Sequence, residues 1–206
     1  MKPRYSHVGD HWRVFCAIAL PEEVREHISQ HQTRVREAVP SARISWTRKE
    51  NLHLTLKFLA TVPISRVENL SSATARATGD SRPFDIKLEG PGVFPSSGNP
   101  HVLWIGVKDE SGSLALLNQR VQDECLKEGF AREERPFHPH LTLGRLRASK
   151  EGRAIARTHT RMVFEPAVVA VTELLIIRSE LSSDGSKYTV ISRHPLGGQL
   201  EPSVRV

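Results

Sequence analysis

The tetrapeptide His-Leu-Thr-Leu occurs twice in the chain, at residues 53–56 and again at residues 140–143. In an extended strand, side chains alternate between two faces, so each histidine shares a face with the threonine two residues later, and the leucines occupy the other face. The leucine face must be buried. Each copy therefore directs an imidazole and a hydroxyl, about 6.5–7 Å apart along the strand, away from that core.

Two histidines that face each other across a cleft are suited to moving protons in both directions. The unperturbed pKa of histidine is about 6.5, so one ring can be a neutral base while the other is a protonated acid. Phosphodiester cleavage needs this pairing, and the hydroxyls of Thr55 and Thr142 can donate hydrogen bonds to the phosphate oxygens. We expect no metal and no other cofactor, because the sequence lacks an acidic cluster that would hold magnesium or a pair of metal ions.

The segments before the two motifs follow the same plan. Phe15 precedes His53 by 38 residues and Leu103 precedes His140 by 37, and a buried strand and an amphipathic helix fill each interval. The expected elements of the two halves are strands at 13–20, 51–59, 102–107 and from 140 to about 147, and helices at 21–40 and 113–129, the latter capped by Ser113. If the halves pack about a pseudo-twofold axis, both His-x-Thr pairs line one cleft.

The rest of the chain does not repeat. The other expected elements are a helix from Pro63 to Gly79, a strand at 83–88, a loop GPGVFPSSGNP at 90–100, a weaker helix at 150–160, one apolar strand at 168–177 and its hairpin partner at 186–192 across SSDG. We expect a single domain over residues 13–196, with an N-terminal tail at 1–12 and a C-terminal tail at 197–206.

Composition is that of a basic globular protein. The 206 residues are 38% hydrophobic and 25% charged with a net charge of +6, which argues against global disorder and favours an anionic partner such as nucleic acid or a phosphorylated small molecule. Cys16 and Cys125 lie in hydrophobic patterns without metal-type spacing, so we expect both to be buried and reduced. No stretch is long enough to be a signal core or a membrane span. These features predict a cytoplasmic protein that does not enter membranes.

The two motif regions, NLHLTLKFL and RPFHPHLTLGRL, resemble the paired His-x-Thr-x motifs of the two-histidine (2H) phosphoesterases. The opening RVFCAIALPEEVRE and the closing SELSSDGSKYTVISRHPL are similar to the bacterial and archaeal RNA 2′,3′-cyclic phosphodiesterases, the LigT or ThpR family. The resemblance covers nearly the whole chain. It implies an α+β, bilobal fold in which two pseudo-symmetric, mainly antiparallel sheets, with helices outside, border a central cleft.

The resemblance also implies a reaction. It is the metal-independent hydrolysis of a terminal RNA 2′,3′-cyclic phosphate to a 2′-phosphate, with water attacking in line with the leaving 3′ oxygen. In the family the first motif histidine, here His53, is the proton donor and the second, here His140, the proton acceptor, whereas the residues alone give the pair without this order. Family members also join tRNA halves through a 2′–5′ linkage, so RNA ends, tRNA halves among them, are the expected partners. Nothing in the sequence calls for assembly, and we expect a monomer.

Two basic residues near the motifs are candidate phosphate ligands. Arg145 stands where the family carries a phosphate-contacting arginine, but strict alternation puts it on the leucine face unless Gly144 hosts a bulge. Lys57 is in phase with His53 and Thr55 and can reach an RNA phosphate, although simple solvation explains it equally well.

Four further residues are candidate substrate contacts. Phe137 and Trp46 can stack on a base, and Tyr188 and Ser179 match the closing segment of the family and can border the cleft. A packing role is the alternative for Phe137, Tyr188 and Ser179.

Three other functions stay open on the sequence alone. They are hydrolysis of small cyclic nucleotides such as a cyclic phosphate of ADP-ribose, a non-catalytic RNA-binding module, and a metal hydrolase that uses His53, His138 and His140. The proline between the last two favours a loop role for His138. The remaining histidines have no informative spacing and are expected at the surface: His7, His11, His27, His31, His101, His159 and His194.

Overall fold

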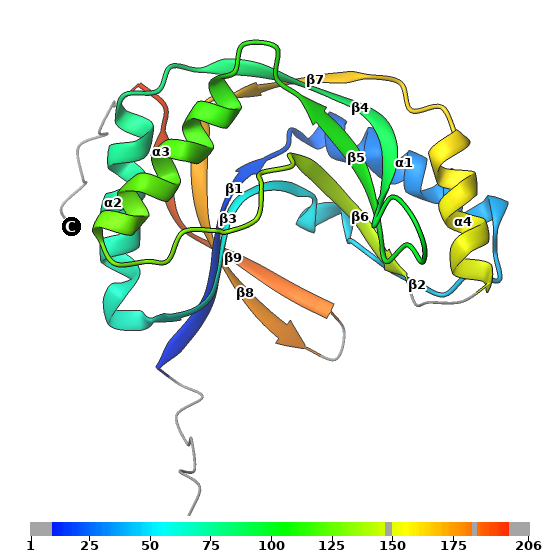
Figure 1. The fold of residues 1–206 in the computed structure, drawn as a ribbon, viewed down its shortest axis with the longest axis horizontal. Coiled ribbons are helices and arrows are strands. Elements are labelled where there is room, and N and C mark those ends of the chain that lie inside the picture. The colour runs from blue at the N-terminus through cyan, green and yellow to red at the C-terminus, as the bar shows by residue number, and fades with distance from the viewer. Residues whose placement is uncertain (1–9, 147–149, 183–184, 198–206) are drawn as a thin grey trace, which may run out of the picture.

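The computed structural model describes residues 10–146, 150–182 and 185–197, in which four α-helices pack outside two antiparallel sheets (Figure 1). Sheet A has the strand order β3-β1-β8-β9, and sheet B has the order β2-β6-β5-β4-β7. The strands are β1 (His11–Ala19), β2 (Ile44–Trp46), β3 (His53–Pro63), β4 (Phe84–Phe94), β5 (Val102–Lys108), β6 (His140–Leu146), β7 (Ala167–Val171), β8 (Glu173–Ser182) and β9 (Gly185–Pro195). The helices are α1 (Glu22–Ala38), α2 (Val67–Gly79), α3 (Ser113–Lys127) and α4 (Lys150–Arg161), with the 3-10 turns η1 (Lys49–Asn51) and η2 (Ile64–Arg66). The expected α+β fold is confirmed.

The two half-repeats are β1-α1-β3 and β5-α3-β6. In each half, the first strand pairs antiparallel with the motif strand. Phe15 pairs with Phe58, five positions after His53. Val102 pairs with Arg145, five positions after His140. Val102, and not Leu103, is therefore the counterpart of Phe15, and the interval to the histidine is the same in both halves.

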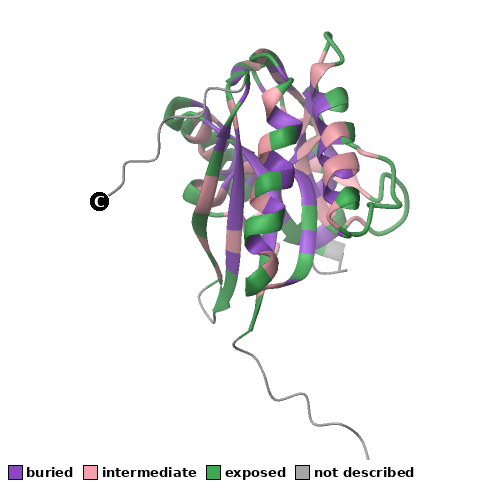
Figure 2. Ribbon diagram, turned by 90° about the vertical axis from the view of Figure 1, so that its left-hand side faces the viewer, coloured by how far each residue is buried: buried purple, intermediate pink, exposed green. Residues whose placement is uncertain are grey.

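The helices of the half-repeats are exchanged between the sheets (Figure 1). The helix α1 follows a strand of sheet A but packs beside α4 against sheet B, while α3 follows a strand of sheet B but packs beside α2 against sheet A. Each half thus covers the sheet of the other half. The result is one main hydrophobic core, in which the buried residues follow the strands and the inner faces of the helices (Figure 2).

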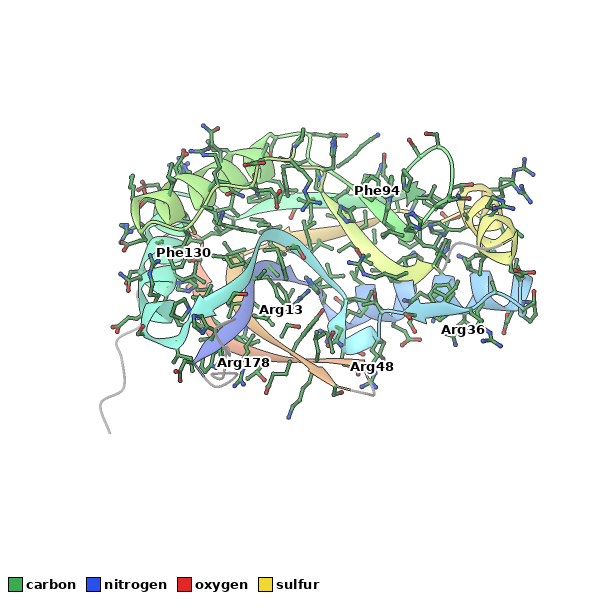
Figure 3. All side chains as sticks on the ribbon, turned by 60° about the horizontal axis from the view of Figure 1, so that its bottom comes forward. Arg13, Arg36, Arg48, Phe94, Phe130 and Arg178 are labelled. Atoms are coloured by element: carbon green, nitrogen blue, oxygen red, sulfur yellow. The ribbon has the colours of Figure 1, made fainter. Side chains whose placement is uncertain are left out.

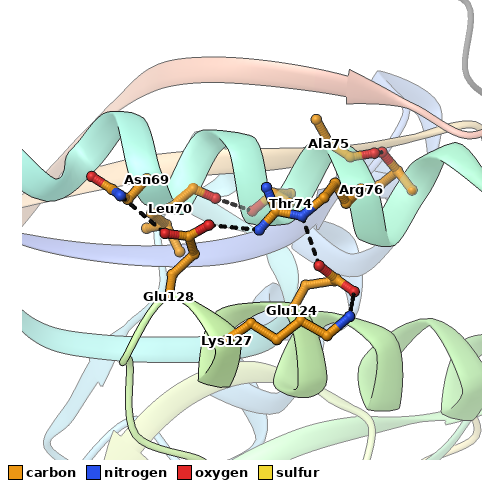
Figure 4. Close-up of polar contacts among 9 residues, drawn as sticks. Asn69, Leu70, Thr74, Ala75, Arg76, Glu124, Lys127 and Glu128 are labelled. Carbon is orange, nitrogen blue, oxygen red and sulfur yellow. Dashed lines mark hydrogen bonds and ion pairs between the residues drawn. The ribbon is translucent and has the colours of Figure 1, made fainter.

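The α2–α3 pair is also joined by surface ion pairs (Figure 4). Arg76 of α2 binds the carboxylates of Glu124 on α3 and of Glu128 just beyond its end, both at 2.7 Å, and the Asn69 amide donates to Glu128 at 3.0 Å. Because exposed ion pairs contribute little to stability, apolar packing holds the two helices together.

Most of the expected elements agree with the structure. The helices α1, α3 and α4, the strand β5 and the β8–β9 hairpin are confirmed, although residues 183–184 of the hairpin turn lie outside the described residues. The helix expected from Pro63 opens with the turn η2 and becomes α-helical at Val67. The described strands begin at His11 and end at Pro195, while residues 1–9 and 198–206 of the expected tails lie outside the described residues.

The single strand expected at 168–177 is wrong. It is two strands in different sheets: β7 pairs with β4 in sheet B and β8 pairs with β1 in sheet A. In β7 buried and exposed positions alternate, whereas β8 is buried over Leu174–Ile177, but the exposed positions of β7 are also apolar, so the sequence run gives no sign of the change of sheet. The exposed Thr172 and the half-buried Glu173 mark the crossing point.

Two predictions at element ends are also wrong. Part of the expected loop at 90–100 belongs to β4, which continues to Phe94 through a bulge at Gly90, where φ is 73°. Ser113 does not cap α3 with its own side chain. Instead, the Asp109 carboxylate accepts a hydrogen bond from the backbone N–H of Leu114 at 2.7 Å.

Both motif strands contain a bulge at the last leucine of HLTL. The residues on either side of Leu56 pair with two consecutive residues of β1, so Leu56 itself has no partner there. Leu143 has no partner on β5 for the same reason. The alternation of faces reverses after each bulge, so the second residue beyond it, Phe58 or Arg145, lies on the side of the histidine. The bulge is a repeated feature of the motif.

The prediction that Lys57 lies in phase with His53 and Thr55 is therefore wrong. Lys57 is only 3% exposed, and its ammonium group donates to Gln122 Oε1 and to the backbone oxygen of Ala131, both at 2.6 Å. It ties β3 to α3 and to the chain that leads into the second motif. Phe58, which is 42% exposed, has the place expected for Lys57.

The surface placement expected for the histidines is wrong at three positions. His31 of α1 and His159 of α4 are completely buried, and His194 of β9 is nearly so. His11 and His101 are exposed, His27 is half-buried, and His7 lies outside the described residues.

The buried pair His31–His159 belongs to a chain of hydrogen bonds between α1 and sheet B. The Trp104 carbonyl can only accept, so His159 Nε2–H donates to it at 3.0 Å, and His159 Nδ1 accepts from His31 Nε2–H at 3.2 Å. His31 Nδ1 in turn accepts from the Arg34 guanidinium at 3.3 Å. This chain of hydrogen bonds requires both imidazoles to be neutral. A second proton on either ring would place two N–H donors against each other.

The two cysteines are buried free thiols, as expected. Burial raises the pKa of Cys16 to about 12 and that of Cys125 to about 11. None of the helices in the described part of the chain has the length and hydrophobicity that crossing a bilayer requires.

We expect Lys57→Met to lower stability with little effect on substrate affinity. Methionine fills a similar volume but leaves Gln122 Oε1 and the Ala131 carbonyl without this donor, at a cost of about 1–3 kcal/mol in the free energy of unfolding. Denaturant unfolding and the KM for substrate measure the two quantities. The exposed Lys49→Met is the control, and a raised KM with unchanged stability in Lys57→Met would return Lys57 to the substrate contacts.

We expect the protein to lose stability as the pH falls below about 6.5. Burial lowers the pKa of His31 to about 4 and also lowers the pKa of His159. The unfolded chain therefore binds protons that the folded chain excludes, and this stability is complete above about pH 6.5 and is lost as the pH falls towards 4. Denaturant unfolding across this range measures the slope, which should be shallower in a His31→Leu/His159→Leu variant. An unchanged slope would contradict the assignment.

Candidate active site

The histidines and threonines of both motifs line one cavity between the two sheets, with a volume of about 400 Å³. His53 and Thr55 come from β3 and His140 and Thr142 from β6, two strands that lie next to each other. The leucines of both motifs face the opposite way and are buried. The arrangement expected from the repeat, with two His-x-Thr pairs at one place, is present.

Each motif histidine is fixed in orientation by a backbone carbonyl two residues earlier. His53 Nδ1 donates to the Asn51 carbonyl and His140 Nδ1 donates to the His138 carbonyl, both at 2.7 Å. A carbonyl oxygen can only accept, so Nδ1 carries a proton in both rings, and Nε2 is the atom left for proton transfer. His53 Nε2 lies 2.9 Å from the Thr55 hydroxyl, which donates to it when the ring is neutral.

Two aromatic rings flank each imidazole. On the first motif histidine, Phe15 stacks with centroids 4.7 Å apart, and Tyr188 stands edge-on at 5.5 Å. Phe94 and Trp104 stand edge-on to the second motif histidine, at 5.0 and 6.4 Å. Of these four, only Tyr188 is among the residues expected from the sequence. The rings restrict the imidazoles and reduce their contact with water.

This environment favours neutral imidazoles in the free protein. Burial lowers the pKa of both His53 and His140, and the carbonyl acceptors at Nδ1 oppose this in part. The positive charge of Arg145 lowers the pKa of His140 further. A negatively charged phosphate in the cavity would raise both pKa values again.

Arg145 joins the motif residues because of the bulge in β6. It lines the central cavity and also the two pockets that flank it. Gly144 is required at the bulge, because a Cβ there would lie 2.8 Å from the Ile44 side chain. The counterpart of Arg145 in the first half is Phe58, whose ring carries the guanidinium of Arg13 at 4.6 Å. An arginine therefore lies on each side of the cavity: Arg145 beside the second motif, and Arg13, stacked on Phe58, beside the first.

The two flanking pockets extend the central cavity in both directions. The first, of about 440 Å³, is lined by Trp46, Arg48 and Tyr188, and the second, of about 790 Å³, includes Phe94 and Phe137. Figure 3 labels Arg13, Arg48 and Phe94 among these side chains. Each flanking pocket shares lining residues with the central cavity, so the three adjoin one another, and we call them together the groove.

The other candidate contacts are placed as follows. Ser179 lies in the wall of the central cavity and is nearly buried. Trp46 packs partly on the core, with the Arg36 guanidinium 5.3 Å from its ring centre, and Phe137 also packs on the core. His138 lines the larger flanking pocket. Within residues 10–146, 150–182 and 185–197, no group of three or more histidine, cysteine or acidic side chains is placed to hold a metal ion.

The site contains residues that the sequence reasoning missed: Phe15, Phe94, Trp104, Phe58, Arg13, Thr47 and Asn51. The repeat holds a signal for one of them, Phe58. Phe15 and Phe58 come from the same positions of the first half as Val102 and Arg145 of the second. Aligning the halves beyond HLTL would have singled out Phe58 as the partner of Arg145.

Relatives of the chain carry names that fit this geometry. A protein of Methanothermobacter thermautotrophicus named RNA 2′,3′-cyclic phosphodiesterase is 34% identical over 181 residues, which cover 86% of this chain and 95% of that protein. A relative of the same name from Archaeoglobus fulgidus is 32% identical over 177 residues, covering 85% and 96%.

Solved structures with the same fold include TT0787 of Thermus thermophilus, with a TM-score of 0.73 and 29% identity over 91% of this chain and all of that chain. The structure of E. coli LigT complexed with 3′-AMP has a TM-score of 0.70 and 29% identity, covering 91% and 99%. The family model of the 2′-5′ RNA ligase superfamily matches residues 10–182. With the paired motifs in one cavity, these matches show that the chain belongs to the 2′-5′ RNA ligase superfamily of two-histidine phosphoesterases.

Proposed function

We propose that this protein hydrolyses the terminal 2′,3′-cyclic phosphate of RNA to a 2′-phosphate. The proposal rests on one observation: two imidazoles lie in one cavity beside two threonine hydroxyls and an arginine. Each ring is held by a hydrogen bond from Nδ1–H, which leaves Nε2 for the reaction. The names of the relatives that cover most of the chain support the same reaction.

In the proposed reaction, His140 Nε2 accepts a proton from a water molecule, whose oxygen attacks phosphorus in line with the 3′ oxygen. The P–O3′ bond breaks as the 3′ oxygen takes the proton from His53 Nε2. The product carries a 2′-phosphate and a 3′-hydroxyl, and exchange with solvent restores both histidines. Thr55, Thr142 and Arg145 hold the non-bridging oxygens as charge develops on them. Both proton transfers are made by side chains, so the proposal requires no metal.

The assignment of acid and base has independent support. Burial lowers the pKa of both histidines, and the positive charge of Arg145 lowers that of His140 further, which favours the unprotonated ring that a proton acceptor needs. The causes that shift the pKa of His53 include no cationic side chain. The family order, with His53 as proton donor, agrees with this asymmetry.

RNA fits the groove better than a small cyclic nucleotide. The pockets on both sides of the phosphate site, of about 440 and 790 Å³, give room for more than one nucleoside. We infer that Trp46, Tyr188 and Phe137 contact bases or sugars there, with Ser179 in the cavity wall. We also infer that a single domain over 13–196 acts as a monomer in the cytoplasm, and that tRNA halves are among its substrates for the reverse 2′–5′ ligation.

We expect His53→Ala and His140→Ala each to slow hydrolysis of an RNA 2′,3′-cyclic phosphate by about 10²–10⁴-fold, the range of general acid–base catalysis. Turnover should be unaffected by EDTA. Multiple-turnover rates measure this, with thermal unfolding to show that the variants fold. His11→Ala, at the far end of β1, is the control. Turnover of either active-site variant within a few-fold of wild type would contradict the mechanism.

We expect kcat/KM to follow a bell-shaped pH profile with its maximum below about pH 6.5. The acidic limb reports the base, which must be neutral, and the basic limb reports the acid, which must be protonated; burial lowers both pKa values in the free enzyme. In Arg145→Met the acidic limb should move to higher pH, because the cation that lowers the pKa of His140 is gone. A maximum well above neutrality would contradict the burial of the two rings.

A further inference from the structure

Arg145 and Phe58, each the second residue after a motif bulge, depend on that bulge for their place in the site. Without the extra residue, Leu143 in β6 or Leu56 in β3, regular alternation would turn Arg145 and Phe58 to the core side. A bulge also removes backbone groups from the ladder and leaves them in need of partners. The question is what keeps each bulge in place.

A buried side-chain amide donates to the carbonyl of each bulge leucine. Asn118 Nδ2 donates to the Leu56 carbonyl at 2.8 Å, and Gln32 Nε2 donates to the Leu143 carbonyl at 2.9 Å. Both amides are nearly inaccessible to solvent. Gln32 Nε2 also donates to the Thr47 carbonyl at 2.9 Å, and the Thr47 N–H donates to the Leu143 carbonyl at 2.8 Å.

The two amides come from equivalent helices and cross between the halves. Gln32 lies on α1 of the first half and holds the bulge of the second motif, and Asn118 lies on α3 of the second half and holds the bulge of the first motif. A buried amide costs free energy unless it is hydrogen-bonded, and apolar residues would serve packing at these positions equally well. The same device is therefore present twice, at the same point of each motif strand.

We propose that Gln32 and Asn118 are positioning residues, which hold the two bulges and thereby aim Arg145 and Phe58 into the active site. This inference rests on the proposed phosphodiesterase function for its kinetic consequences. Neither amide lines the central cavity of the two histidines, whereas Asn118 borders the larger flanking pocket. Gln32 acts through Arg145 on the phosphate, and Asn118 acts through Phe58 on the part of the substrate that this ring contacts.

Replacement of Gln32 by methionine tests the proposal, since methionine keeps the volume but has no donor. We expect Gln32→Met to lower kcat/KM by about 10–100-fold, the effect of a small misplacement of a catalytic contact. In a double-mutant cycle, Gln32→Met should add little to Arg145→Met, because both remove the same contact. Effects that multiply would overturn the proposal, as would wild-type kcat/KM in Gln32→Met.

The matched control is Gln122→Met on α3. Gln122 is another buried glutamine and borders the larger flanking pocket, but its Oε1 accepts from the Lys57 ammonium and its amide donates to neither bulge carbonyl. Its loss should lower stability, and whatever small effect it has on kcat/KM should multiply with that of Arg145→Met. Should Gln32→Met not fold, Asn118→Leu with Phe58→Ala gives the same cycle at the first motif.

A crystal structure of Gln32→Met, or of Asn118→Leu, decides the matter without any assay. We expect the bulge to be lost or the residue beyond it to leave the cavity, and an unchanged bulge with that residue in place would overturn the inference. If the wild-type protein hydrolyses no cyclic phosphate, the proposed function fails, and the crystal structure alone then decides whether the amides hold the bulges.

Discussion

The burial of the leucine face of each motif strand is the constraint on which the site depends. Leu54 and Leu141 are fully inaccessible to solvent, and the leucines that follow them are nearly so. Each such side chain contributes about 1.5–3 kcal/mol when it leaves water, so turning either strand over would cost several kcal/mol. The imidazole and hydroxyl on the other face are fixed in direction by the packing behind them. Because the two strands lie side by side, the same constraint acts twice on one cavity.

The exchange of helices between the halves couples the two motifs. Each sheet is covered by a helix that belongs to the other half, and the main core is continuous across both. Neither half could close its core alone. The two histidines are thus held at a fixed distance and orientation. The reaction requires this, because one histidine removes a proton on one side of the phosphate while the other donates a proton on the opposite side. Arg145 then differentiates two otherwise similar half-sites, because it occupies the position that Phe58 has in the first half and adds to the effect of burial in lowering the pKa of His140.

Strand and helix periodicity was sufficient to predict the motif faces and the half-repeat, and the resemblance to the two-histidine phosphoesterases supplied the fold class. Periodicity failed where the period changes. The bulge after HLTL reverses the faces, which put Lys57 in the core; only Gly144 in the second copy gives a sign of it in the sequence. The run at 168–177 is divided between two strands in different sheets. Both strands are apolar, so hydrophobicity alone cannot locate the division.

The buried histidines were missed for a different reason. His31 continues the helical stripe of Val24, Ile28 and Val35, and His159 follows Ile155 by four residues, so both occupy core positions. Residue type suggested the surface, and spacing indicated the core. The hydrogen-bond chain that satisfies the two rings is a tertiary feature, formed by helices more than a hundred residues apart, and no local pattern contains it.

The identity of the product tests the central claim most directly. An RNA oligonucleotide ending in a 2′,3′-cyclic phosphate is incubated with the enzyme in ¹⁸O-labelled water and EDTA, and the product is analysed by mass spectrometry and by its sensitivity to phosphatase and periodate. Water attack in line with the 3′ oxygen, with His140 as base and His53 as acid, predicts a 2′-phosphate with one labelled oxygen and a free 3′-hydroxyl. A 3′-phosphate, or a reaction that EDTA stops and added metal restores, would contradict this mechanism.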